Sequence, residues 1–160
     1  MYRDGDFPED YELWLRWLQA GIRIHKINQP LLRWYDSKIR LTRTDKRYRT
    51  EAFYNIKTKY LLQWLMQNNP HHPNVVVWGA SRISRKRTKI LQENHIEISH
   101  YIDISEKRKL DKSVILFSEI PAPEKVFILV YIAHTEIREE IKKYLDSRGF
   151  CEGTNYLFVS

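Results

Sequence analysis

Two adjacent carboxylates, Glu9 and Asp10, are the side chains whose chemistry is easiest to interpret. They follow Asp6 and Pro8 at the predicted start of a helix, where Asp6 can cap the chain and Pro8 is tolerated in the first turn. The positive end of the helix dipole favours an ionised carboxylate. Such a group can accept the proton of a sugar hydroxyl that attacks an activated donor. Acids at helix starts are also common for structural reasons, so the pair alone leaves both interpretations open.

A second candidate feature is the basic stretch from Arg33 to Arg49, which contains seven Lys and Arg but only two Asp. It accounts for much of the net charge of +7. Such a stretch suits a nucleic acid, the diphosphate of a nucleotide-sugar or an anionic membrane surface. It is equally typical of a solvated loop. Because no nucleic-acid-binding motif accompanies it, we expect no nucleic-acid partner.

A third feature is the turn after the apolar run 74–78, where Gly79, Ser81 and Ser84 stand at the three glycine positions of a dinucleotide-binding fingerprint. The glycine permits a tight turn, but side chains at the other two positions would crowd a pyrophosphate at the helix N-terminus. Asp103 ends the next predicted strand, where an acid can bind a ribose. Nucleotide binding through Gly79, Ser81 and Asp103 and a structural or docking role both remain open.

The elements that must position Glu9 and Asp10 are mostly helical. An amphipathic helix is predicted from residue 8 to Gly21, a short strand over 22–27 and a second helix over 50–67. The apolar stripe of the first helix consists of Tyr11, Trp14, Leu15 and Leu18. One short strand cannot cover this stripe. We therefore expect residues 1–68 to be marginally stable alone and to lean on the second domain or form a homo-oligomer through their exposed face.

The remainder of the chain alternates strands with helices. Residues 69–74 contain two prolines and no periodicity, which predicts a linker. The predicted elements after it are strands over 74–78, 98–103, 114–117, 126–132 and 156–159, with helices over 82–94 and 136–148. This order is typical of a small parallel sheet wrapped by helices. The sequence therefore predicts a mainly helical segment over 1–68 and a Rossmann-like α/β domain over 75–160.

Composition bounds the functional class. The chain has 160 residues, 42% of them hydrophobic, which suffices for a packed core but not for a large enzyme. A single cysteine, Cys151, excludes an internal disulfide, and no spacing of the six His predicts a metal site. No apolar run has the length of a signal peptide or a membrane span. We expect a soluble cytoplasmic protein.

The order of motifs resembles the C-terminal part of inverting, bacterial family-two glycosyltransferases together with an appended Rossmann-like domain. The first part is similar through Glu9-Asp10-Tyr11-Glu12-Leu13-Trp14-Leu15-Arg16, Ile27-Asn28-Gln29-Pro30-Leu31-Leu32 and Leu41-Thr42-Arg43-Thr44-Asp45. The appended domain is similar through Trp78-Gly79-Ala80, Tyr101-Ile102-Asp103-Ile104 and Gly149-Phe150. The resemblance thus spans nearly the whole chain.

This resemblance implies transfer of a sugar from a nucleotide-sugar to a glycan or lipid-linked acceptor, with inversion, in the synthesis of a cell-envelope polysaccharide. Asp10 would be the general base, Glu9 would shape the acceptor site, and Trp14 would pack beneath the base. The loop from residue 34 to 43 would close over the donor. Arg40 and Arg43 would contact its diphosphate, since guanidinium groups pair phosphate oxygens in a bidentate manner.

The family binds its donor and a divalent metal, Mg²⁺ or Mn²⁺, through an Asp-x-Asp element in its N-terminal half. Asp4-Gly5-Asp6 has this spelling, but no apolar strand precedes it. We therefore expect a fragment or truncated product that alone binds neither donor nor metal and is inactive. The alternative is a non-catalytic Rossmann-like module that binds a nucleotide or anion. The implied location is cytoplasmic, with a peripheral position at the inner face of the membrane as an option.

Overall fold

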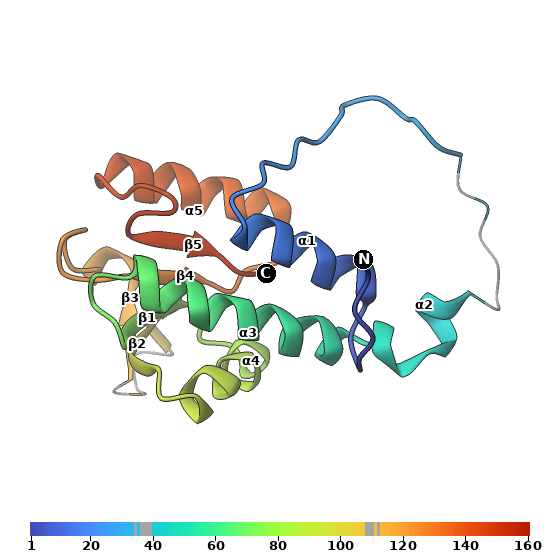
Figure 1. Ribbon diagram of the computed structural model, residues 1–160. Coiled ribbons are helices and arrows are strands. Elements are labelled where there is room, and N and C mark those ends of the chain that lie inside the picture. The colour runs from blue at the N-terminus through green and yellow to red at the C-terminus, as the bar shows by residue number, and fades with distance from the viewer. Residues whose placement is uncertain (34, 36–39, 108–110, 112) are drawn as a thin grey trace. The chain divides into compact units, whose positions relative to one another are not determined.

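The computed structural model describes residues 1–33, 35, 40–107, 111 and 113–160 (Figure 1). Its internal contacts divide the chain into two compact units, Met1–Gln63 and Trp64–Ser160. The division falls within helix α3, whereas the sequence predicted a linker over 69–74. In that segment the buried Asn69 donates from Nδ2 to the backbone oxygen of Asn74 at 2.9 Å, which closes a turn before the sheet.

The first unit is built from helices, as expected. It contains α1 (Glu9–Gln19), the short α2 (Leu41–Thr44), the 3-10 helix η1 (Lys46–Tyr48) and the N-terminal part of α3 (Thr50–Asn68). α1 ends where Gly21 adopts a φ of 78°, which a glycine accommodates without strain. The predictions of both long helices and of the glycine stop are confirmed.

Two local predictions in this unit were wrong. Residues 22–27 form no strand, because the described part of Met1–Gln63 offers no second strand for their backbone groups to pair with. Asp6 does not cap α1: Pro8 occupies the cap position without a side-chain cap bond, and Asp6 instead pairs with Lys46 at 3.0 Å.

α1 and α3 run side by side in the same direction. The rings of Tyr11 and Phe53 lie 5.1 Å apart, and Gln19 Nε2 donates to Gln63 Oε1 at 2.7 Å further along both helices. Leu13 is buried, whereas Trp14, for which the resemblance implied packing beneath Asp10, is 50% exposed. The apolar stripe of α1 is therefore only partly covered.

The second unit contains a five-stranded parallel sheet with the order β3-β2-β1-β4-β5. The strands are β1 (Asn74–Trp78), β2 (Glu97–Asp103), β3 (Val114–Leu116), β4 (Ile128–Val130) and β5 (Tyr156–Phe158). Helix α4 (Arg82–Glu93) connects β1 to β2, η3 (Phe117–Glu119) follows β3, and α5 (Thr135–Ser147) connects β4 to β5. The prediction of a Rossmann-like α/β domain is confirmed.

Both faces of this sheet are covered, which explains the continuous apolar runs of its central strands. Ile141 and Leu145 of α5 pack on one face in a core with Trp78 and Val130. On the other face, Thr88 of α4 shares a hydrogen bond of 2.9 Å with the hydroxyl of Tyr101 in β2. Figure 1 shows α4 and α5 on opposite sides of the strands.

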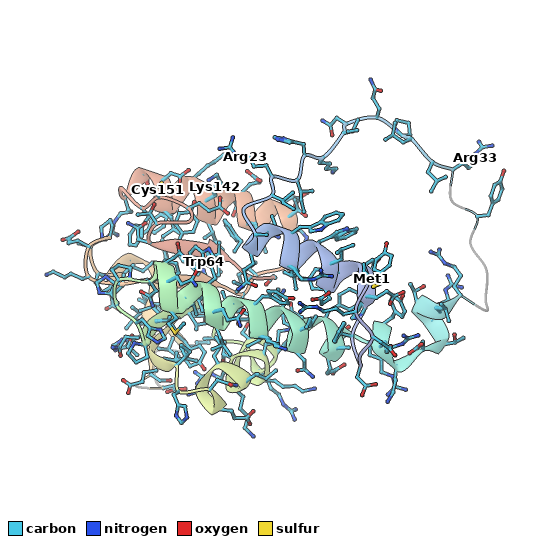
Figure 2. The ribbon with its side chains drawn as sticks, viewed as in Figure 1. Met1, Arg23, Arg33, Trp64, Lys142 and Cys151 are labelled. Atoms are coloured by element: carbon cyan, nitrogen blue, oxygen red, sulfur yellow. The ribbon has the colours of Figure 1, made fainter. Side chains whose placement is uncertain are left out.

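Within the second unit, the end of α3 also packs against the sheet. The ring centroids of Trp64, labelled in Figure 2, and of Phe127 lie 5.8 Å apart. Leu65 is fully buried. Because α3 is continuous from Thr50 to Asn68, one helix supplies residues to both units.

Candidate functional site

Three carboxylates occupy the first turn of α1: Glu9, Asp10 and Glu12. Both oxygens of Glu9 lie near the hydroxyl of Tyr48, which donates to Oε1 at 2.9 Å and is 3.0 Å from Oε2. A hydrogen bond from its own backbone N–H and the bond from Tyr48 hold the pKa of Glu9 below its usual range. Burial and the Glu9 charge raise the pKa of Tyr48 to about 12, so the phenol remains a donor at neutral pH.

Glu12 is the buried member of the three, with a side chain only 1% exposed. Its carboxylate accepts hydrogen bonds from Tyr60 and from Arg16, whose Nε lies 3.3 Å from Oε1, and pairs with Arg3 at 3.5 Å. Burial is the largest single influence and raises the pKa, but the hydrogen bonds and charges of Tyr60, Arg16 and Arg3 outweigh it and lower the pKa. Glu12 is therefore an ionised group with a structural role.

Asp10 is exposed, in contrast to Glu12. Its Oδ1 accepts the backbone N–H of Tyr11 at 2.7 Å, and among the described residues no cation forms an ion pair with it. Its second oxygen is directed to no described donor. Of the three acids, Asp10 thus has the carboxylate that an external hydroxyl can reach.

The turn from Asp45 to Tyr48 lies beside the first turn of α1. Asp45 accepts hydrogen bonds from Arg47, with Nη2 at 2.7 Å from Oδ2, and Tyr48 reaches Glu9 across the same region. Lys46 reaches Asp6 in the segment just before α1. The helix start and this basic turn are therefore joined by side-chain contacts.

The two arginines assigned to the donor diphosphate lie at α2, directly before that turn. Arg40 is half-buried at the N-terminal end of α2, and Arg43 is exposed within it. Both interact with other groups of the chain. Trp34 and residues 36–39 of the expected donor loop lie outside the described residues. Arg40 and Arg43 belong to the same compact unit as Asp10, Met1–Gln63.

At the end of β1, the geometry follows the sequence expectation for a tight turn. Gly79 has a φ of +122°, and a Cβ there would lie 2.9 Å from Ser84 Oγ. Ser81 caps α4 by accepting the N–H of Ser84 at 3.1 Å, and the two hydroxyls lie 3.0 Å apart. The serines therefore occupy the N-terminus of α4 with their own hydrogen bonds, where a nucleotide-binding turn presents N–H groups to phosphate.

Asp103 stands at the end of β2, as expected, and its Oδ1 accepts the N–H of Ser105 at 2.9 Å. Arg85 of α4 stacks over the Tyr101 ring at 4.3 Å and pairs with Asp111 at 2.7 Å. These contacts give both side chains structural roles at this edge of the sheet. Because β1 and β2 pair in parallel, Gly79, Ser81 and Asp103 lie at the carboxyl ends of neighbouring strands.

The described residues do not provide a metal site. No group of three or more His, Cys, Asp and Glu among them could hold an ion. In the Asp-x-Asp spelling, Asp4 accepts the N–H of Gly5 at 3.0 Å and Asp6 pairs with Lys46. These residues do not fit the divalent metal that the resemblance to family-two glycosyltransferases implies. Separately, none of the helices in the described ranges is long and apolar enough to cross a membrane.

Sequence reasoning missed the residues that hold the neighbouring acids in place. Tyr48 and Tyr60 lie 39 and 48 positions from their carboxylate partners, and no local pattern announces pairings at such separations. The Glu12–Arg16 pair had a signal, since a spacing of four residues places both side chains on one helix face.

Comparison of the chain with protein-family models, curated proteins and solved structures finds no match.

Proposed function

We propose that residues 1–68 form part of the acceptor side of an inverting, nucleotide-sugar-dependent glycosyltransferase, with Asp10 as its general base. The observation that carries the proposal is the contrast among the three acids of the first turn of α1. Glu9 is held by Tyr48 and Glu12 by Arg16 and Tyr60, while Asp10 is exposed. The resemblance of the motifs from Glu9 to Asp45 to family-two transferases supports the same assignment.

The proposed step is a single displacement. The acceptor hydroxyl oxygen bonds to the anomeric carbon of the sugar while the bond from that carbon to the nucleoside diphosphate oxygen breaks. The proton of the hydroxyl passes to the Asp10 carboxylate, and the electron pair of the broken bond leaves with the diphosphate. A carboxylate at a helix N-terminus is ionised at neutral pH and thus ready to accept this proton.

Within this proposal Glu9 is a positioning residue. Its bonds to Tyr48 tie the start of α1 to the turn that follows α2. Arg40 and Arg43 would offset the charge that develops on the leaving diphosphate.

The test is the rate of sugar transfer by the complete product of the gene that encodes these residues. Purified protein is given UDP-, GDP- and dTDP-sugars with a lipid extract of the source cells as acceptor, and released nucleoside diphosphate is measured. We expect Asp10→Asn to lower the rate at saturating substrate by about a hundredfold or more.

The control variant is Asp6→Asn, which removes an exposed carboxylate close in sequence that pairs with Lys46. It should transfer sugar at the wild-type rate. A complete product that uses none of these donors would contradict the proposed function. An Asp10→Asn variant with undiminished turnover would contradict the role of Asp10.

A further inference from the structure

The segment from Ala20 to Arg33 combines exposed aliphatic side chains with unbalanced positive charge. It contains neither helix nor strand. Five aliphatic side chains in it are exposed, with Leu31 and Leu32 each at 71%. The exposed aliphatic residues are Ile22, Ile24, Ile27, Leu31 and Leu32. A run of this kind in water leaves an apolar surface uncovered, which marks an interaction site.

Cations are interleaved with these aliphatic residues. The segment holds Arg23, Lys26 and Arg33 and no acidic residue. All three are exposed, and none forms an ion pair within the described part of the chain. Figure 2 shows the side chain of Arg33 extending away from the backbone. The positive charge continues along the sequence, since residues 22–49 contain nine Lys and Arg against two Asp.

We propose that residues 20–33 bind the surface of an anionic lipid bilayer. The aliphatic side chains would insert between acyl chains at the level of the headgroups, while Arg23, Lys26 and Arg33 remain at the phosphates. Juxtaposed aliphatic and basic side chains are the combination by which peripheral proteins bind such surfaces. The inference goes beyond the proposed transferase and does not depend on it, because lipid binding requires neither donor nor turnover.

Two other occupants fit the segment less well. A nucleic acid would complement the charge, but single-stranded binding uses large aromatic side chains as stacking surfaces, and residues 20–33 contain no Phe, Trp or Tyr. A phosphate backbone also leaves the five aliphatic side chains in water. A second copy of the chain would bring two acid-free basic segments together, and like charges oppose such a contact. An anionic bilayer complements both properties at once.

The test is sedimentation of the 160-residue chain with vesicles of phosphatidylcholine alone or mixed with phosphatidylglycerol. We expect binding to the anionic vesicles only. Replacing Arg23, Lys26 and Arg33 together by Gln should weaken binding about a hundredfold, at roughly fivefold for each cation near the surface. The charge-neutral double variant Leu31→Asn/Leu32→Asn should also lose binding, whereas a purely electrostatic contact would change far less, because the net charge of the segment is unaltered.

The matched control removes the same charge elsewhere by replacing the exposed Arg82, Lys125 and Lys143 with Gln. It should bind vesicles several tens of times more tightly than the first triple variant. Circular dichroism of each variant verifies that the sheet and helices persist. Equal losses in both triple variants, or no binding of wild type to anionic vesicles, would overturn the proposal. Two other results without vesicle binding would also overturn it. One is binding of single-stranded RNA by the chain, and the other is self-association that the Leu31 and Leu32 changes abolish.

Discussion

Neighbouring acids in one helical turn differ here because their partners differ. Glu9 and Glu12 are held by phenol hydroxyls from η1 and α3, and Glu12 is held by Arg16 as well. Asp10 accepts only a local backbone N–H among the described groups and stays exposed. Residue type and position could be read from the sequence, which predicted Glu9 and Asp10 as a site. The sequence could not show which of these acids has a structural role, because that role depends on contacts with tyrosines far away along the chain.

Glu12 provides a test of this assignment through stability. Because Glu12→Gln removes a buried charge that Arg16 and Tyr60 satisfy, we expect the free energy of unfolding to fall by about 1–3 kcal/mol at pH 7. The folded-state pKa of Glu12 is lowered, so its contribution is present above the ordinary pKa and is lost as the pH falls through the folded value. The difference in the free energy of unfolding between wild type and Glu12→Gln should therefore become smaller below about pH 4.

Urea unfolding followed by tryptophan fluorescence measures this gap, since Trp14 and Trp17 lie in α1. The exposed Asp10→Asn variant is the control and should lose less stability at pH 7 than Glu12→Gln does, because its charge lies in the same helical turn but is not buried. A Glu12→Gln variant as stable as wild type at pH 7 would show that the buried network around Glu12 does not hold the helix start.

At the scale of elements, local signals were sufficient wherever a helix or strand had its own pattern. α3, β1 and α4 begin where the sequence predicted, since the hydrophobic periodicity changes at each of them. The strand over 22–27 failed because an apolar alternation needs a partner strand, which single-segment patterns do not reveal. β4 is shorter than the predicted 126–132, and β3 ends one residue early where η3 begins. Where a strand ends depends on how far its backbone hydrogen bonds with the neighbouring strand extend, which the sequence of one segment does not reveal.

The turn between β1 and α4 gives a prediction at this scale. Gly79→Ala should lower the free energy of unfolding by about 1–3 kcal/mol, because φ is +122° and the new Cβ would meet Ser84 Oγ at 2.9 Å. Gly153→Ala is the matched control: φ is +82° there too, but no atom lies within 4 Å of the added Cβ. Its cost should be smaller, about 1 kcal/mol.

Urea unfolding monitored by far-ultraviolet circular dichroism compares the two glycine variants directly. The difference between them reports the close approach of Ser84 together with the higher φ of Gly79, +122° against +82°. Equal stabilities for the two variants would contradict the tight packing of Gly79 against the start of α4.

At the scale of the whole molecule, the chain divides its properties between two units. Trp64–Ser160 has a two-sided sheet and a continuous core, whereas Met1–Gln63 leaves several large apolar side chains exposed. The sequence predicted this contrast from the number of elements on each side. It did not predict the division within α3, because a single uninterrupted helix has no internal boundary signal.

The central claim is that Asp10 removes the proton of the attacking hydroxyl, and the acidity of that hydroxyl tests it most directly. The complete gene product and its Asp10→Asn variant are compared on two acceptors, one natural and one with fluorine beside the attacking hydroxyl. A more acidic hydroxyl needs less help from a base. We predict that the rate deficit of the variant shrinks at least tenfold on the fluorinated acceptor. An equal deficit on both acceptors would contradict proton removal by Asp10.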